Sequence, residues 1–186
     1  MKQIIKFTIA LILGIVAIGF QSCDHSNKRY EYISKQIPAT FATVDVVGAS
    51  SMSPAKFSNF MGNDFDKTRT QRTDDGVAVV YEWKNDGKYN LTEDEHFDCC
   101  ALFDYNRNTN EPTITNIAIR FSSSSVDALD KFYSIAMSEL EPLMSNWGFK
   151  LNEQLQKPTL KYYLKGNEVI TISKDSQEVT FTKIYR

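Results

Sequence analysis

Hydrophobic residues follow three different patterns along the chain, and each pattern predicts a different kind of segment. Residues 7–20 form an apolar run with one polar side chain, Thr8. Between residues 40 and 121, and again after residue 160, short alternating stretches are separated by Gly, Asn and Asp, which is typical of β-hairpins. Residues 126–140 repeat apolar side chains every three or four positions. That spacing predicts a helix with one face on a core.

The alternating stretches predict an antiparallel sheet. Connections as short as Gly166-Asn167 and Asp175-Ser176 are too short for the crossover that joins two parallel strands. Neighbouring strands must therefore run antiparallel. In the stretch 113–121 we expect one side of the strand to be formed by Thr115, Ile117, Ile119 and Phe121. Strands are expected over residues 40–47, 67–72, 77–83, 99–105, 113–121, 160–165, 168–174 and 178–185, with a further candidate at 149–155.

Two helices are expected between these strands. The shorter one has Ser53 as N-cap and Pro54 in its first turn, where the missing N–H costs nothing, and Gly62 ends it. The longer one covers residues 125–147. Its start is marked by a capping box of Ser124 and Asp127, and Pro142 should kink or end it. Its core side is expected to be formed by Leu129, Phe132, Ala136 and Leu140.

The order of these elements predicts an α+β fold, an antiparallel sheet with one long and one short helix packed on it. A helix at 53–62 precedes one meander and a helix at 125–147 precedes another, as expected of two helix-plus-meander repeats. This order resembles the β-lactamase inhibitor protein fold and the small outer-membrane assembly lipoproteins similar to it. The resemblance covers element order only and implies no functional residue.

The N-terminal run has the form of an export signal. Lys2 and Lys6 precede it, and its length falls short of the roughly 20 apolar residues needed to span a bilayer. Cys23 follows the small residue Ser22, and the chain then turns polar. This pattern resembles the lipobox of bacterial lipoproteins, with Phe20 and Gln21 departing from its commonest residues. An ordinary secretory signal and an uncleaved anchor are the alternatives.

Resemblance to that family implies that the signal is removed and that Cys23 carries diacylglycerol, with a further acyl chain such as palmitate on its amino group. Several acyl chains hold a protein stably at a membrane, because each buried CH₂ contributes about 0.8 kcal/mol. We therefore expect a lipid-anchored protein of the bacterial cell envelope and its periplasm, at the outer membrane rather than the inner one.

These features divide the chain into three parts. Residues 1–22 are the signal peptide, residues 23–38 are the lipidated cysteine and a flexible polar tether closed by Pro38, and residues 39–186 are one globular domain. Without Lys2 and Lys6, the 21 basic and 23 acidic residues leave a net charge near −4. A charge of this sign, with no basic cluster, argues against nucleic acid as a partner.

Residues 93–100 bring together carboxylates, His96, Cys99 and Cys100, all of which can be metal ligands. Their spacing matches neither a Cys-x-x-Cys nor a His-Glu-x-x-His site, and on a strand Cys99 faces away from the other two. We expect a solvated acidic loop that leads into a strand, with no metal and no cofactor. Adjacent cysteines favour one buried and one half-exposed free thiol over a strained vicinal disulfide.

No catalytic residue is assigned, because the chain lacks a nucleophile elbow and a phosphate-binding loop and has one histidine in its folded part. Tyr162 and Tyr163 must face opposite sides of a strand, and exposed strand aromatics are enriched at binding surfaces. The expected function is therefore a lipid-anchored binding or assembly module for another envelope protein or a glycan, rather than an enzyme. The alternative is a small-molecule or lipid carrier with a cavity under the long helix.

Overall fold

The computed structural model describes residues 27–62, 65–72, 76–83, 89–105 and 111–185. The expected signal peptide and Cys23 lie outside these residues. The described chain forms one antiparallel sheet of eight strands in the order β1-β2-β3-β4-β8-β7-β6-β5. The strands are β1 Phe65–Arg72, β2 Gly76–Trp83, β3 Glu95–Tyr105, β4 Pro112–Ser123, β5 Lys150–Leu151, β6 Leu160–Lys165, β7 Glu168–Lys174 and β8 Glu178–Ile184.

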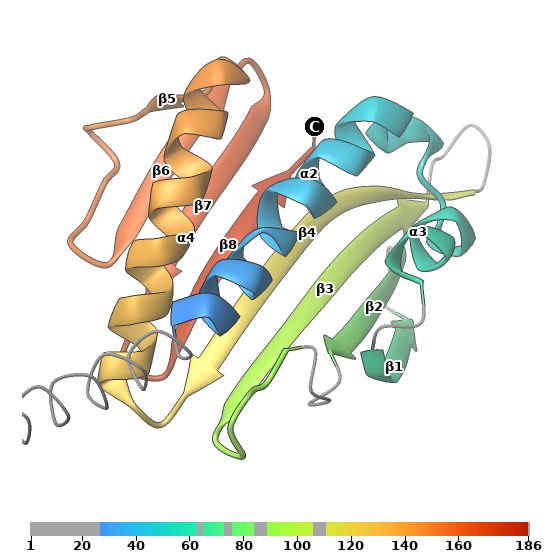
Figure 1. Ribbon diagram of the computed structural model, residues 1–186. Helices are drawn as coiled ribbons and strands as arrows, with labels where there is room; N and C mark the ends of the chain where they lie inside the picture. The colour runs from blue at the N-terminus through green and yellow to red at the C-terminus, as the bar shows by residue number, and fades with distance from the viewer. Residues whose placement is uncertain (1–26, 63–64, 73–75, 84–88, 106–110, 186) are drawn as a thin grey trace, which may run out of the picture.

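The helices lie on one face of this sheet (Figure 1). They are α2 Gln36–Val47, α3 Pro54–Met61 and α4 Val126–Asn146, and a short 3-10 turn, Ala49–Ser51, joins α2 to α3. Each half of the chain places helix before meander, and each meander runs from an edge of the sheet inward until β4 and β8 pair at the centre. The predicted α+β fold with a long helix packed on a sheet is confirmed.

The core is aromatic and lies between α4 and the sheet. Leu129, Phe132, Ala136 and Leu140 are all fully buried, as expected. Phe132 is central to this packing. Ring centroids around it lie 4.4 Å away for Phe121, 6.2 Å for Phe181, 6.2 Å for Tyr30 and 6.4 Å for Phe97.

The start of α4 differs from expectation, whereas its end at Asn146 agrees with the expected range of 125–147. Its N-cap is Ser125, whose hydroxyl accepts a hydrogen bond from the Ala128 N–H, so the capping box that we expected from Ser124 and Asp127 is wrong by one residue. Pro142 lies inside the helix, which continues to Asn146. Fully buried side chains on both sides of the proline, including Leu140 and Met144, hold the last turn on the sheet.

The N-terminal region is the largest correction. Residues 27–34 are helical and continue, after a turn at Lys35, into α2, so the flexible tether expected up to residue 38 and the strand expected at 40–47 are both wrong. The reason is an apolar spacing of three and four residues, which fits a helix. Pro38 falls in the first turn of α2, where its missing N–H has no helical partner to lose. The buried residues are Tyr30, Ile33, Ile37, Phe41 and Val44.

A bulge and an early strand start change two smaller expectations. The register between β3 and β4 shifts between Leu102 and Phe103, so Ile114, and not Thr115, is buried on the same side as Ile117 and Ile119. Strand β3 begins at Glu95, which places most of the expected acidic loop within the sheet. The short helix agrees with its prediction, with Ser53 accepting from the Lys56 N–H at one end and Gly62 capping the other.

Candidate functional site

The sheet face opposite the helices is covered by no helix of the described chain (Figure 1). Across β8, β7 and β6, the register places three rows of partly exposed, uncharged side chains side by side on this face. We call this area the uncharged face. Its residues are Thr180, Ser173 and Leu160, then Thr182, Thr171 and Tyr162, then Ile184, Val169 and Leu164. A mixture of hydroxyl, aliphatic and phenol groups can exclude water while still forming hydrogen bonds.

The same side of the sheet is charged on the strands of the other half. The Arg120 guanidinium donates two hydrogen bonds to the Asp98 carboxylate on β3, at 2.8 and 3.0 Å, and Arg69 pairs with Glu82 at 2.8 Å. Burial raises the pKa of Asp98, and the attraction of Arg120 opposes that rise. These opposite charges neutralise each other. The surface of this half of the sheet therefore contains paired charges, whereas the uncharged face contains no charged side chain.

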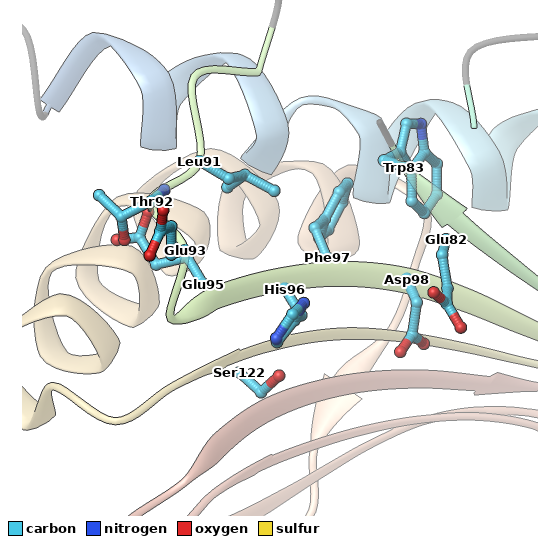
Figure 2. Close-up of a pocket in the computed structure, with 10 residues that line it drawn as sticks. All are labelled: Glu82, Trp83, Leu91, Thr92, Glu93, Glu95, His96, Phe97, Asp98 and Ser122. Carbon is cyan, nitrogen blue, oxygen red and sulfur yellow. Dashed lines mark hydrogen bonds between the residues drawn. The ribbon is translucent and has the colours of Figure 1, made fainter. Parts of the chain in front are cut away.

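A pocket of about 480 Å³ lies where β2 ends and β3 begins. Figure 2 shows its lining side chains on both sides of β3: Trp83, Leu91 and Phe97 lie on the helix side, whereas Glu82, His96, Asp98 and Ser122 lie on the other. The lining therefore has apolar residues together with Glu95 on the helix side of the strand, and polar and acidic residues on the other side. Glu82 and Asp98 are cross-strand neighbours, but Asp98 is paired with Arg120 and Glu95 lies on the other side of β3, so the lining carboxylates do not all converge on one point as a metal site requires.

One carboxylate of this lining, Glu95, is buried and fully engaged. It accepts hydrogen bonds from the Tyr30 hydroxyl at 2.6 Å, from Arg29 Nη2 at 2.6 Å and from the Thr92 N–H at 3.0 Å. Burial is the main reason why the pKa of Tyr30 rises to about 12, and its bond to Glu95 adds to the rise. This network fastens the N-terminal helix to the start of β3, and we assign it a structural role.

The remaining candidates from residues 93–100 are separated by the sheet. His96 is exposed beside its cross-strand neighbour Ser122, and the next carboxylate on its face, Asp98, is held by Arg120. Cys99 is buried and Cys100 is half-buried, and both are free thiols, as expected. Burial raises the pKa of both thiols. Among the described residues, no group of three or more His, Cys, Asp or Glu side chains is placed to hold a metal ion.

Of the two tyrosines of β6, Tyr162 is partly exposed and lies on the uncharged face, while Tyr163 is 5% exposed and faces the helices. The Tyr163 hydroxyl donates a 2.6 Å hydrogen bond to Glu141 of α4. The alternation of the strand thus separates the two rings as its period of two requires. Tyr162 is the aromatic residue of the uncharged face.

Sequence reasoning missed a second buried ionic cluster, around Lys183 on β8. Its side chain is fully buried, pairs with Asp45 of α2, and has Glu168 Oε2 at 3.1 Å from its ammonium. The rings of Tyr185, Phe149 and Trp147 lie 4.8, 5.3 and 5.9 Å from the same ammonium. The alternation of β8 places position 183 on the helix side, but the sequence gives no reason to expect a lysine to be buried there. This cluster holds α2 on the sheet.

A scan against models of known protein families, a search of curated proteins and a search of solved structures each found no match. Within the described ranges, no helix is long and apolar enough to cross a membrane.

Proposed function

We propose that this chain is a lipid-anchored lipoprotein of the bacterial cell envelope whose domain binds another envelope protein or a glycan through the uncharged face. The observation that carries the proposal is the one-sided covering of the sheet. Helices bury one face, and the other presents nine partly exposed side chains without a charge on β6, β7 and β8. Depletion of charge at the centre of a patch, with a charged surround, is the composition of binding surfaces.

The carrier alternative requires space between α4 and the sheet. In the described chain that region is filled by the rings around Phe132, with the Phe121 centroid 4.4 Å away and Leu129, Ala136 and Leu140 fully buried beside it. A ligand there would have to displace close-packed aromatic side chains, which typically costs several kcal/mol. Binding at the surface of the sheet is therefore the better-supported function.

The proposal is tested by placing a charge on the uncharged face. Thr171 and Thr182 are cross-strand neighbours at its centre, so Thr182→Arg introduces a long cation where a partner would desolvate it. The matched control is Ser134→Arg on the exposed side of α4. Both variants and the native chain are used to recover partners from detergent-solubilised envelopes and to probe an array of envelope glycans.

We expect Thr182→Arg to lose a partner that the native chain and Ser134→Arg both retain. A partner or glycan held equally by all three would show that binding uses another surface, and the proposal for the uncharged face would be wrong. Thermal unfolding of each variant, followed by circular dichroism, separates loss of binding from loss of fold.

A further inference from the structure

The distance between the proposed lipid anchor and the folded domain is short. Cys23 and Asn27, the first described helical residue, are four residues apart. An extended chain advances about 3.3–3.6 Å per residue, so the two Cα atoms are at most about 14 Å apart in any conformation of the residues between them. That reach is comparable to the diameter of one helix, about 10–12 Å. The start of the helix must therefore lie close to the bilayer.

The tether cannot be lengthened by unwinding this helix without disrupting the core. Tyr30 and Ile33 are buried, and the Tyr30 ring packs edge-on against Phe121 at 5.6 Å. Arg29 and Tyr30 both bind the buried Glu95, at 2.6 Å each. The point at which the chain leaves the domain is thus fixed to the start of β3.

Three segments meet at this point, and we call them the anchor end: residues 27–29, 91–95 and 123–126. Hydrogen bonds join them, because Glu95 accepts from Arg29 at 2.6 Å and Asp94 accepts from the Ser124 hydroxyl at 2.9 Å. Figure 1 shows the start of the N-terminal helix beside the first turn of α4 and the end of β4. At this end Val126 is 54% exposed.

The opposite end of the molecule is far from the anchor. A helical rise of 1.5 Å per residue separates Asn27 from Val47 by about 30 Å. Strands β3 and β4 lie alongside α2, so β3 runs from the anchor end toward the opposite end and β4 returns (Figure 1). The anchor end carries exposed residues of both signs, including Lys28, Glu93 and Asp94, so charge attraction to lipid is not what brings it to the surface.

We propose that the anchor end rests on the bilayer surface and that the end of α2 at Val47 points away from it. This inference rests on the proposed lipidation of Cys23. It places the strands upright on the membrane, so that the uncharged face looks sideways along the bilayer. A partner in the same membrane could then reach that face without the domain leaving the surface.

The two tryptophans lie at different distances from the anchor end, so their fluorescence can measure the orientation of the domain. The Trp83 ring lies 6.5 Å from Tyr89, which lies 5.4 Å from Tyr32 in the N-terminal helix. Trp147 lies 5.9 Å from the Lys183 ammonium, which is bound to Asp45 near the end of α2. Along the helix, the positions of Tyr32 and Asp45 are about 20 Å apart. Trp83 is therefore the tryptophan nearer to the anchor end.

The experiment uses the mature lipoprotein, purified with its own acyl chains, in phosphatidylcholine vesicles that contain dansyl-labelled lipid headgroups. Trp147→Phe retains Trp83 alone and Trp83→Phe retains Trp147 alone, since the chain has two tryptophans. Energy transfer to the dansyl groups is measured for each variant. Both are compared with forms that carry a Gly-Ser insertion of about 20 residues between His25 and Ser26, which adds a mean reach of about 25 Å.

We expect transfer from Trp83 to exceed transfer from Trp147 several-fold, and the insertion to lower the Trp83 signal until the two are similar. Equal transfer from both tryptophans with the native tether would overturn the upright orientation. The same insertion is also made in the native chain, which keeps both tryptophans and therefore needs no core substitution. Energy transfer that is unchanged by this insertion would also overturn the upright orientation. Failure of the proposed lipidation is identified separately, from the mass of the N-terminal peptide. A Cys23 without acyl chains would contradict the proposed function itself.

Discussion

Glu95 is a buried charge that three groups bind. Its side chain is 2% exposed, and it accepts from Arg29, Tyr30 and the Thr92 N–H. Glu95→Ala leaves these donors without their acceptor, so we expect a loss of about 2–4 kcal/mol in the free energy of unfolding. The matched control is Glu93→Ala, an exposed carboxylate two residues away, which should stay within about 0.5 kcal/mol. Urea denaturation measures both, and equal effects would contradict the assignment.

Tyr30 gives the same network a pH dependence. Its pKa is about 12 in the folded chain, mainly because of burial, and about 10 when unfolded. The folded state therefore holds the proton to higher pH, and its contribution to stability is present below pH 10 and lost as the pH rises toward 12. Tyr163 and Tyr185 also have raised pKa values, so the native chain has several such contributions.

The contribution of Tyr30 is isolated by the variant Tyr30→Phe. Between pH 10 and 12, the stability of this variant should fall less steeply than that of the native chain, whatever its stability at neutral pH. Thermal unfolding at a series of pH values provides the two slopes. Parallel slopes would mean that the Tyr30 phenol ionises as readily in the folded state as in the unfolded one.

At the scale of elements, the N-terminal helix decides where the domain begins. A chain that starts at residue 39, the boundary expected from the sequence, lacks Tyr30, Ile33 and Ile37, each at most 1% exposed. Removing one such side chain typically costs about 2–5 kcal/mol, so the loss of three is comparable to the whole stability of a domain, about 5–15 kcal/mol. We expect a soluble chain of residues 24–186 to unfold cooperatively and the chain 39–186 to lack a cooperative transition. Comparable transitions would make the helix dispensable.

The elements that the sequence predicted well are those whose signals are local. The hairpins of β6, β7 and β8 and the short helix after Ser53 were expected from turn residues and a cap, and the structure has them. The N-terminal helix was missed because charged residues and Pro38 interrupt its apolar spacing. Its identity depends on packing against Phe121 and Phe132, which lie far away in the chain.

The candidate site was predictable only in part, for the same reason. The alternation of β6 was enough to indicate that Tyr162 or Tyr163 would be exposed. The uncharged face needs the pairing of β8 with β7 and of β7 with β6, and it becomes a surface only because all helices lie on the other side. The ionic cluster of Lys183 and Asp45 joins residues 138 positions apart, a contact that no local pattern can predict.

At the scale of the whole molecule, one side of the sheet provides stability and the other remains available. The rings around Phe132 and the ion pair of Lys183 with Asp45 fasten the helices to the covered side. On the uncovered side, Asp98 and Glu82 of the first half pair with Arg120 and Arg69. The nine side chains of the uncharged face carry no charge, and the charged residues Glu178 and Lys150 lie at its border. If Cys23 is lipidated as proposed, the anchor comprises only the four residues from Cys23 to Asn27, and an anchor of that length would hold the proposed binding surface in a defined position relative to the membrane.

The proposed anchoring depends on one residue. If Cys23 carries the acyl chains, Cys23→Ala should abolish incorporation of labelled palmitate and leave either an uncleaved precursor or a released domain, because no other group on the chain would replace several acyl chains at about 0.8 kcal/mol per buried CH₂. Cys100→Ala is the matched control, since its half-buried thiol on β3 belongs to the folded domain. It should incorporate the label and fractionate with membranes like the native chain. Labelling, signal-peptide cleavage and membrane fractionation are followed in the same cells. A native chain that takes up no label, or a Cys23→Ala chain that still takes it up, would show that the domain is delivered in another way.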